Sequence, residues 1–350
     1  MDEMKQWRYR QLHGMHVLKK EPSLRMIALD LSSVCNFGCR YCYGKAASYD
    51  KQTELLSLSE YLQLLTEAKQ FGVECILIIG AHENTLSPAY LPILRKAEEL
   101  GLFAVTFTNG AAFGNDEIAR QAHQLSAFNF TKAVAELSRT SVILKYDSPR
   151  ESVQNQLVRN PSAFSQIQTA LKNLLASKLF SDVAFGFPRF GINSVLTKIN
   201  YQDIASIVDF AYQNRLVYFC DTVLWSGEAL KERKNLELSS QQLRECLDAI
   251  AKVMALRNIA GAAKDLINFY DAECLLFDNY FFVANDGGVL PCAGFPQRRL
   301  GNIREGLSVV AKRKMEMVRK YYQIHFGHHG DKCPCRVHLE DKLILIILHA

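Results

Sequence analysis

Residues 25–43 read RMIALDLSSVCNFGCRYCY and combine a short apolar run with three closely spaced cysteines. The run over residues 25–31 is typical of a short buried β-strand. Cys35, Cys39 and Cys42 follow it in a loop, and loops that leave the C-terminal ends of strands carry the chemistry in β/α barrels. The segment therefore predicts the first strand of a barrel together with a reactive site.

Downstream of this loop the chain alternates between β-rich apolar runs and segments with helical spacing. We expect strands at residues 25–31, 75–80, 103–108, 141–146, 183–195 (one strand or two) and 216–224, and helices at 58–71, 91–100, 164–174, 203–213 and 241–255. Strand–helix units of this length pack as parallel, right-handed βαβ units. The pattern predicts an α/β fold, a partial (β/α)6 TIM-like barrel, although a doubly wound sheet would have similar periodicity.

The three cysteines of the first loop suit an iron–sulfur cluster. Three thiolates within eight residues can bind one side of a four-iron–four-sulfur cluster and leave one iron without a protein ligand. Gly38 allows the loop to turn tightly, and Tyr41 can cover an edge of the cluster. A zinc site or three unconnected thiols are the alternatives, but zinc ligands usually come in fours and no fourth ligand lies nearby.

The Cys-x3-Cys-x-aromatic-Cys pattern directly after a first strand resembles the signature of the radical S-adenosylmethionine (radical SAM) superfamily, over roughly residues 25–230. The resemblance implies a [4Fe–4S] cluster whose open iron is chelated by the amino and carboxylate groups of SAM. It also implies that one electron, from a flavodoxin- or ferredoxin-like donor, cleaves SAM to methionine and a 5′-deoxyadenosyl radical. That radical abstracts a hydrogen atom from a substrate.

Several polar residues stand where this family contacts SAM. The turn at residues 80–83, Gly-Ala-His-Glu, replaces the family's Gly-Gly-Glu turn and departs from it at Ala81 and His82. The residues that the resemblance implies for SAM binding are Gly80, Glu83, Asn109, Lys145, Ser148, Arg189 and Asn193, and each could instead be a polar residue of the barrel mouth. Cys220, near the end of the sixth strand, is a candidate hydrogen-atom donor if its side chain points into the barrel.

A second set of cysteines lies further along the chain. Cys274 and Cys292 bracket two β-rich runs around Asn-Asp-Gly-Gly at residues 285–288, a strong hairpin signal. Together with Cys333 and Cys335 they resemble the twitch and SPASM extensions of radical SAM enzymes, which implies an auxiliary [4Fe–4S] cluster. The closing Cys-Pro-Cys departs from that pattern, and a structural zinc site with four cysteines is the alternative.

Near residue 256 the alternation of strand and helix patterns gives way to β-rich runs around a hairpin signal, and this change predicts two domains. We expect an N-terminal lead (1–24), the radical SAM partial barrel (25–255), a small α+β hairpin domain that holds the auxiliary cluster (256–342) and a C-terminal tail (343–350). A basic helix is expected at residues 307–325 of the hairpin domain.

Composition limits the remaining possibilities. The chain has 350 residues, 49% of them hydrophobic and 22% charged, as in soluble globular proteins. No apolar run is long enough to span a bilayer and no signal peptide is visible, so we expect a cytoplasmic protein without membrane contact. In that compartment cysteines are metal ligands or buried thiols, and Cys75 and Cys246 suit the latter. The net charge of +5 is scattered, which argues against nucleic-acid binding but would favour an acidic electron donor.

The resemblance leads to a functional prediction. Twitch enzymes oxidise or epimerise sugars and aminocyclitols, so we expect a radical SAM enzyme that acts on a small sugar-like or aminocyclitol-like molecule. About 25 residues precede the barrel, too few for a separate peptide-binding domain, which leaves a peptide or protein maturase as the second prediction. A hypothesis of another class is that the chain is a non-catalytic binding protein whose fold is stabilised by bound metal.

Overall fold

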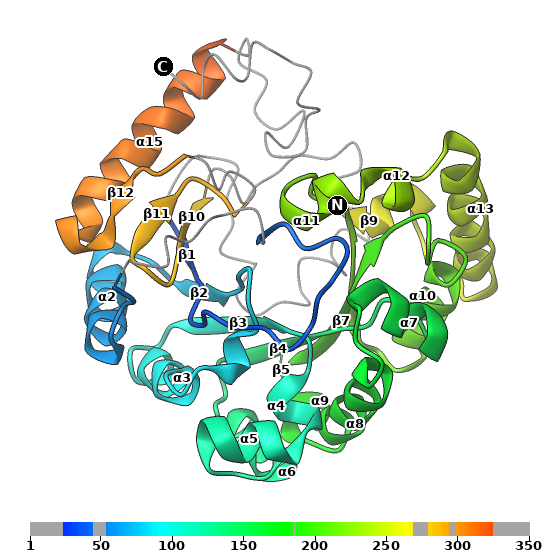
Figure 1. Cartoon of the computed structure of the whole chain (residues 1–350), viewed down its shortest axis with the longest axis horizontal. Helices are drawn as coiled ribbons and strands as arrows, with labels where there is room; N and C mark the ends of the chain where they lie inside the picture. The colour runs from blue at the N-terminus through cyan, green and yellow to red at the C-terminus, as the bar shows by residue number, and fades with distance from the viewer. Residues whose placement is uncertain (1–23, 45–53, 185–186, 269–278, 294–297, 325–350) are drawn as a thin grey trace.

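A computed structural model of the chain describes residues 24–44, 54–184, 187–268, 279–293 and 298–324 (Figure 1). In this part of the chain ten strands form one sheet in the order β12-β11-β10-β1-β2-β3-β4-β7-β8-β9. In Figure 1 the strands curve around a centre and the long helices lie outside them. This arrangement agrees with the predicted α/β partial barrel.

The central strands pair in parallel, each with its neighbour in the sheet order. They are β1 (Met26–Leu29), β2 (Cys75–Ile78), β3 (Phe103–Thr108), β4 (Thr140–Lys145), β7 (Phe190–Leu196), β8 (Val217–Thr222) and β9 (Ile267–Asn268). The segment expected as one strand or two at 183–195 contains three: β5 (Val183–Ala184) and β6 (Phe187–Pro188) form a small antiparallel sheet before β7. The other expected strands are confirmed within two residues.

The five helices expected between residues 58 and 255 are confirmed within one residue at each end, and shorter helices lie between them. The described helices are α2 (Leu58–Phe71), η3 (Asn84–Leu86), α3 (Tyr90–Glu99), α4 (Ala111–Gly114), α5 (Asp116–His123), α6 (Ala127–Ala135), α7 (Glu151–Val158), α8 (Ala163–Leu175), α9 (Lys178–Ser181), α10 (Ile204–Gln213), α11 (Gly227–Lys231), α12 (Arg233–Leu236), α13 (Ser240–Leu256), η4 (Ala263–Leu266), η5 (Ile303–Glu305) and α15 (Leu307–Ile324). Helix α2 begins with a capping box between Ser57 and Glu60 and ends at Gly72, whose φ of 98° suits glycine. Among the described helices, none has the length and apolar character that a membrane span requires.

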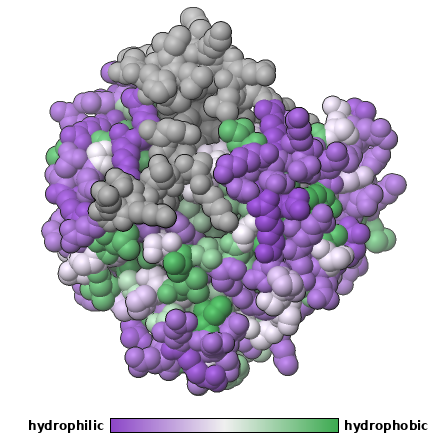
Figure 2. Space-filling model, viewed as in Figure 1, coloured by the Kyte–Doolittle hydropathy of each residue, from purple (hydrophilic) through white to green (hydrophobic). Residues whose placement is uncertain are grey.

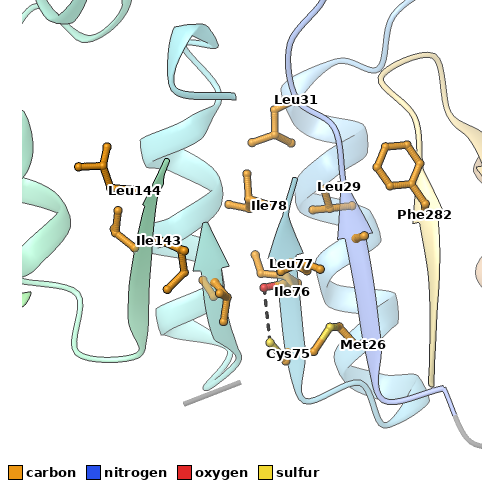
Figure 3. Packing of buried hydrophobic residues seen from close by; sticks show 14 of the residues in the cluster. Met26, Leu29, Leu31, Cys75, Ile76, Leu77, Ile78, Ile143, Leu144 and Phe282 are labelled. Carbon is orange, nitrogen blue, oxygen red and sulfur yellow. Dashed lines mark hydrogen bonds between the residues drawn. The ribbon is translucent and has the colours of Figure 1, made fainter. Parts of the chain in front are cut away.

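The strands are apolar on both faces, because one face packs against the surrounding helices and the other lines the barrel interior. Figure 3 shows Leu29, Ile76, Leu77 and Ile143 in this core, with Phe282 of β10 alongside. Each of these side chains is at most 4% exposed, and full burial of one such side chain contributes about 1.5–3 kcal/mol. On the face seen in Figure 2, hydrophilic residues dominate the outer helices.

The two faces of the sheet can be told apart by register and contacts. Leu144 lies beside Ala170 of α8, and Thr106 accepts a hydrogen bond from Tyr90 of α3, so these strand positions face the helices. Side chains alternate along a strand, so the intervening positions face the interior. Lys145 is one of these interior positions, and its register partner Asn193 on β7 shares that face.

The C-terminal hairpin is part of the barrel sheet. Strand β10 (Tyr280–Val283) pairs in parallel with β1, and β11 (Gly288–Leu290) and β12 (Gly301–Asn302) follow as antiparallel neighbours. The predicted turn at residues 285–288 is confirmed, with Gly287 at a φ of 82°. The division of the chain at residue 256 remains a prediction, and residues 325–342 of the expected hairpin domain lie outside the described residues.

Candidate active site

The loop with the three cysteines is held from two sides at the C-terminal ends of the strands. The Gly38 amide donates to the Val158 carbonyl (2.9 Å), which ties the loop to the end of α7. The amides of Glu228 and Ala229, in the first turn of α11, donate to the Cys42 carbonyl (2.9 and 3.3 Å). Backbone bonds of this kind fix a loop that has no regular structure of its own.

Aromatic and charged side chains connect the same loop to strand β4. Tyr41 is buried, and its hydroxyl donates to the carboxylate of Asp147. The Lys145 ammonium lies 4.4 Å from the centre of the Tyr41 ring and 3.6 Å from the Asp147 carboxylate. A cation above the face of an aromatic ring is attracted to the ring electrons, so this contact is favourable. Asp147 also accepts from the Val195 amide (2.9 Å), so it joins the cysteine loop, β4 and β7.

The three thiols have partners suited to bound sulfur. Cys35 is exposed and accepts from the Phe37 amide (3.5 Å), while the Asn109 side-chain amide lies 3.8 Å from the same sulfur. Cys42 lies 3.8 Å from the Ala81 carbonyl oxygen. Burial raises the pKa of the Cys39 thiol to about 12, and the Lys145 ammonium opposes part of that rise. The Lys145 cation therefore offsets part of the effect that burial has on the Cys39 thiol.

The turn at residues 80–83 is anchored to the end of β1. Asp30 is fully buried and accepts from the Ala81 amide and from His82 Nδ1, each at 3.2 Å. A Cβ at Gly80 would lie 2.2 Å from the Asp30 carboxyl carbon, so this position requires glycine. The turn brings the Ala81 carbonyl to Cys42 and leaves Gly80 at the mouth of the barrel.

Glu83 joins two neighbouring turns inside the protein. Its carboxylate is 3% exposed and accepts from Thr85 (backbone 3.1 Å, hydroxyl 2.6 Å), the Thr108 hydroxyl (2.6 Å) and the Asn109 amide (2.7 Å). Burial raises the pKa of Glu83, and these donors oppose the rise. Both carboxylate oxygens thus bind protein groups, so Glu83 joins the turns that follow β2 and β3, and its predicted contact with SAM stays a prediction.

The family comparison decides the identity of this site. A model described as "Radical SAM superfamily" matches residues 29–211, just over half of the chain. The chain belongs to the radical SAM superfamily. This family of enzymes binds a [4Fe–4S] cluster and SAM.

The relatives of the chain are distant. The GTP 3′,8-cyclase of Synechococcus elongatus is 29% identical over 191 residues, which are 53% of this chain and 51% of that protein. The AdoMet-dependent heme synthase of Methanosarcina barkeri is 24% identical over 308 residues, 80% of each protein. The chain therefore spans only about half the length of the cyclase.

Solved structures support the radical SAM fold. SuiB of Streptococcus suis bound to S-adenosylmethionine has a TM-score of 0.60 at 17% identity and covers 87% of this chain and 71% of its own. The anSMEcpe structure with bound AdoMet has a TM-score of 0.57 at 17% identity and covers 84% and 82%. At this identity the likeness extends to the fold alone.

The residues of the radical SAM loop fit a [4Fe–4S] cluster. In the described part of the chain no three His, Cys, Asp or Glu side chains lie close enough to surround a single metal ion. A four-iron cluster does not require such closeness, because each thiolate binds a different iron. The N–H groups directed at Cys35 and the Lys145 cation match the surroundings that stabilise cluster-bound thiolates. Cys35, Cys39 and Cys42 would hold the cluster.

Two of the other residues expected to bind SAM have different partners in this radical SAM barrel. The amide of Asn109 faces the cysteine loop, where Nδ2 donates to the Asn36 side chain (2.8 Å). Ser148 is fully buried, and its hydroxyl donates to Asp203 (2.6 Å), so it organises the turn before α7. The predicted SAM contact of Ser148 stays a prediction. Lys145 and Asn193 do lie on the interior face of the strands.

Arg189 is a correction to the sequence-based prediction. It precedes the first residue of β7, at the end of the strand opposite the barrel mouth. Its buried guanidinium donates to the carbonyls of Ala135, Leu137 and Thr140 at 2.7–2.8 Å. The residue holds the end of α6 against the start of β4, and it is too far along the strand to contact SAM.

Cys220 is a second correction. It pairs in register with Ser194 of β7, on the face that packs against the helices, and it is fully buried. The interior positions of β8 are its neighbours Phe219 and Asp221. The predicted role of Cys220 as a hydrogen-atom donor is therefore wrong, because its side chain points away from the barrel interior.

Sequence reasoning missed two of the residues that connect these parts. Asp30 follows strand β1 and Asp221 lies near the end of β8, and each accepts hydrogen bonds from a neighbouring element. A carboxylate at the end of a strand was the available signal for both. Of the second cysteine set, Cys274, Cys333 and Cys335 lie outside the described residues, and Cys292 is buried with the Tyr280 hydroxyl 3.1 Å from its sulfur.

Proposed function

We propose that this chain uses a [4Fe–4S] cluster on Cys35, Cys39 and Cys42 to cleave SAM reductively and to start radical chemistry on a small, sugar-like or aminocyclitol-like molecule. The observation that carries the proposal is the position of the three thiols, on one anchored loop beside the Lys145 cation. When bound, the cluster supplies the electron that breaks the sulfonium bond of SAM. Oxidation or epimerisation of the substrate would follow from hydrogen abstraction.

The side chains of the barrel mouth have separate tasks in this proposal. Lys145 would bind the carboxylate of SAM, because it is the cation beside the cysteine loop and points to the interior. The backbone of the turn at Gly80 would receive the amino group of SAM, since its Ala81 carbonyl lies next to Cys42. Asn193 would orient SAM or substrate from the neighbouring strand β7. The buried core beneath excludes water from the radical.

A second cluster is also part of the proposal. Cys274, Cys292, Cys333 and Cys335 would hold an auxiliary [4Fe–4S] cluster within residues 256–342 and would accept an electron from the substrate or bind it. The hydrogen bond from Tyr280 to Cys292 supports a ligand role, because donors to sulfur are common around cluster cysteines. A flavodoxin- or ferredoxin-like protein would supply electrons.

Peptide modification is the second candidate function. A structure of SuiB of Streptococcus suis bound to its precursor peptide SuiA has a TM-score of 0.56 to this chain at 16% identity. The relatives also include a nucleotide dehydratase, 23% identical over 241 residues. A small polar substrate remains our first choice because of the polar groups inside the barrel.

The proposal predicts reductive SAM cleavage that depends on the first cysteine loop. Anaerobically reconstituted protein with dithionite should convert SAM to 5′-deoxyadenosine, and Cys39→Ala should abolish the product because a cluster without one thiolate does not persist. Cys220→Ala is the matched control and should retain the activity, since that thiol lies on the outer face. Chromatography of the nucleosides measures the result. Release of S-adenosylhomocysteine without 5′-deoxyadenosine would contradict the proposal.

A further inference from the structure

Three polar side chains form a group inside the barrel that the cluster loop does not use. Asn193 of β7 donates from its amide to one oxygen of Asp221 (2.8 Å), and Asn268 of β9 donates to the other (3.0 Å). Both amides therefore fix the plane of the Asp221 carboxylate. A carboxylate accepts about four hydrogen bonds, so two amides leave part of its capacity for another donor.

The register places this group at the mouth, on the interior face. Asn193 pairs with Lys145 on one side and Phe219 on the other, and Asp221 pairs with Val195 and Asn268. Asp221 and Asn268 are partly exposed, as a ligand contact requires. The aromatic rings of Phe219 and Phe107 lie nearby, with centroids 5.8 Å apart, and present an apolar surface next to the carboxylate.

The charges of the interior face are acidic on balance. Among the described strand positions that face the interior, Lys145 is the one basic residue, and it already lies near Asp147. Asp30 is held by His82 and the Ala81 amide. By contrast, the described residues give Asp221 only neutral amide partners and no ion pair. A cationic or hydroxyl donor would complete this site, whereas a phosphate would face an uncompensated carboxylate.

We propose that Asp221 is a substrate-binding residue that accepts hydrogen bonds from an ammonium or hydroxyl group, and that the substrate is an amine-bearing or hydroxyl-bearing molecule without a phosphate at that end. This inference rests on the proposed radical SAM function and names its substrate class. Asn193 and Asn268 are positioning residues that hold the carboxylate before the ligand arrives, which lowers the cost of binding. The site lies on β8 and β9, at the barrel mouth.

Equilibrium dialysis of the reconstituted, SAM-loaded protein tests the inference with three matched probes: D-glucosamine, D-glucose and D-glucose 6-phosphate. A charge-assisted hydrogen bond corresponds to about tenfold or more in affinity. Glucosamine should therefore bind at least about tenfold more tightly than glucose 6-phosphate. Asp221→Asn should remove this preference, and Asp221→Glu, which keeps the charge, should retain most of it. Asp248→Asn, the same charge change on the exposed face of α13, should have no effect.

Two results would overturn the inference. One is equal or tighter binding of glucose 6-phosphate, or no binding of glucosamine, in the wild-type protein, which requires no variant to fold. The other concerns SAM cleavage measured in the absence of substrate. If Asp221→Asn protein loses this cleavage but keeps its cluster absorbance, Asp221 acts on SAM and not on the substrate. Dithionite-driven 5′-deoxyadenosine formation by wild-type protein, measured on the same sample, separates failure of this inference from failure of the proposed function.

Discussion

The side-chain amide of Asn109 has an orientation that its neighbours determine. Its oxygen accepts from the Ala111 amide (2.9 Å), which can only donate, so the NH2 group must face Asn36 and the Cys35 sulfur. Hydrogen bonds to cluster sulfurs stabilise the reduced, more negative cluster and so raise its reduction potential. At the scale of single residues, Asn109 is thus a positioning and tuning group for Cys35.

This geometry predicts a redox effect. Asn109→Leu should lower the midpoint potential of the first cluster, because the sulfur loses one N–H donor. The measurement is a redox titration followed by electron paramagnetic resonance (EPR) on reconstituted protein. Asn129→Leu, an exposed position on α6, is the control and should leave the potential unchanged. An unchanged midpoint potential in Asn109→Leu protein with a full cluster would contradict the role of Asn109 as a tuning group.

The positions of residues along the chain were easier to predict than the directions in which their side chains point. The sequence pattern located Lys145 and Asn193 near the barrel mouth, and the register confirms that both face the interior. It could not show that Cys220 faces outward while Asp221 faces inward, because a shift of one residue in the strand exchanges the two faces. The burial of Arg189 was not visible in the sequence because the expected segment at 183–195 merged β5, β6 and β7, which hid that Arg189 lies before the start of β7.

At the scale of elements, the cysteine loop depends on the short helix α11. Gly227 has a φ of 62°, and a Cβ there would lie 2.5 Å from the Tyr43 carbonyl oxygen. Ionic contacts strengthen the same junction, since Arg159 binds Glu228 and Glu232 at 2.7 Å and Arg40 binds Glu232 at 3.2 Å. Helix α11 thus packs against the loop beside the end of α7, to which Arg159 joins it.

A glycine substitution tests this contact. Gly227→Ala should displace α11 from the loop and reduce the iron retained by the first cluster, as absorbance after exposure to air would measure. Gly72→Ala is the matched control, because it has a similar positive φ of 98° but nothing within 4 Å of the added Cβ. Both substitutions carry a backbone cost of about 1 kcal/mol. Equal cluster loss in the two variants would show that backbone strain, and not the contact between Gly227 and Tyr43, causes the loss of iron.

The long elements were predictable because their apolar periodicity is strong. The helix at residues 58–71 has the predicted bounds, and α8 and α13 differ from expectation by one residue at each end. The short helices α11 and α12 were missed because four or five residues are too few for a periodic pattern. The three strands at 183–196 were merged for the same reason.

At the scale of the whole molecule, the hairpin at β10 and β11 continues the barrel sheet past β1. Residues 26 and 280 are paired in register although about 250 positions separate them in the chain, and no local pattern reveals such a pairing. The sequence therefore predicted the hairpin but not its place beside β1. Cys292 follows β11 on the same sheet that leads into the first cysteine loop.

The proposed second cluster sets the iron content of the molecule. Anaerobically reconstituted protein should contain about eight iron atoms per chain, and the triple variant Cys35→Ala, Cys39→Ala, Cys42→Ala should keep about four. Iron and zinc analysis of both proteins is the measurement. Four iron atoms together with zinc in the wild-type protein would assign the second cysteine set to a structural zinc site.

The central claim is that the loop at residues 35–42 holds a [4Fe–4S] cluster whose open iron receives SAM. EPR spectra of the dithionite-reduced protein, recorded before and after addition of SAM, test it most directly. We predict a cluster signal whose g values change when SAM is added, and loss of both the signal change and the first cluster in Cys39→Ala. A wild-type spectrum that SAM leaves unchanged, in protein with a full complement of iron, would contradict the claim.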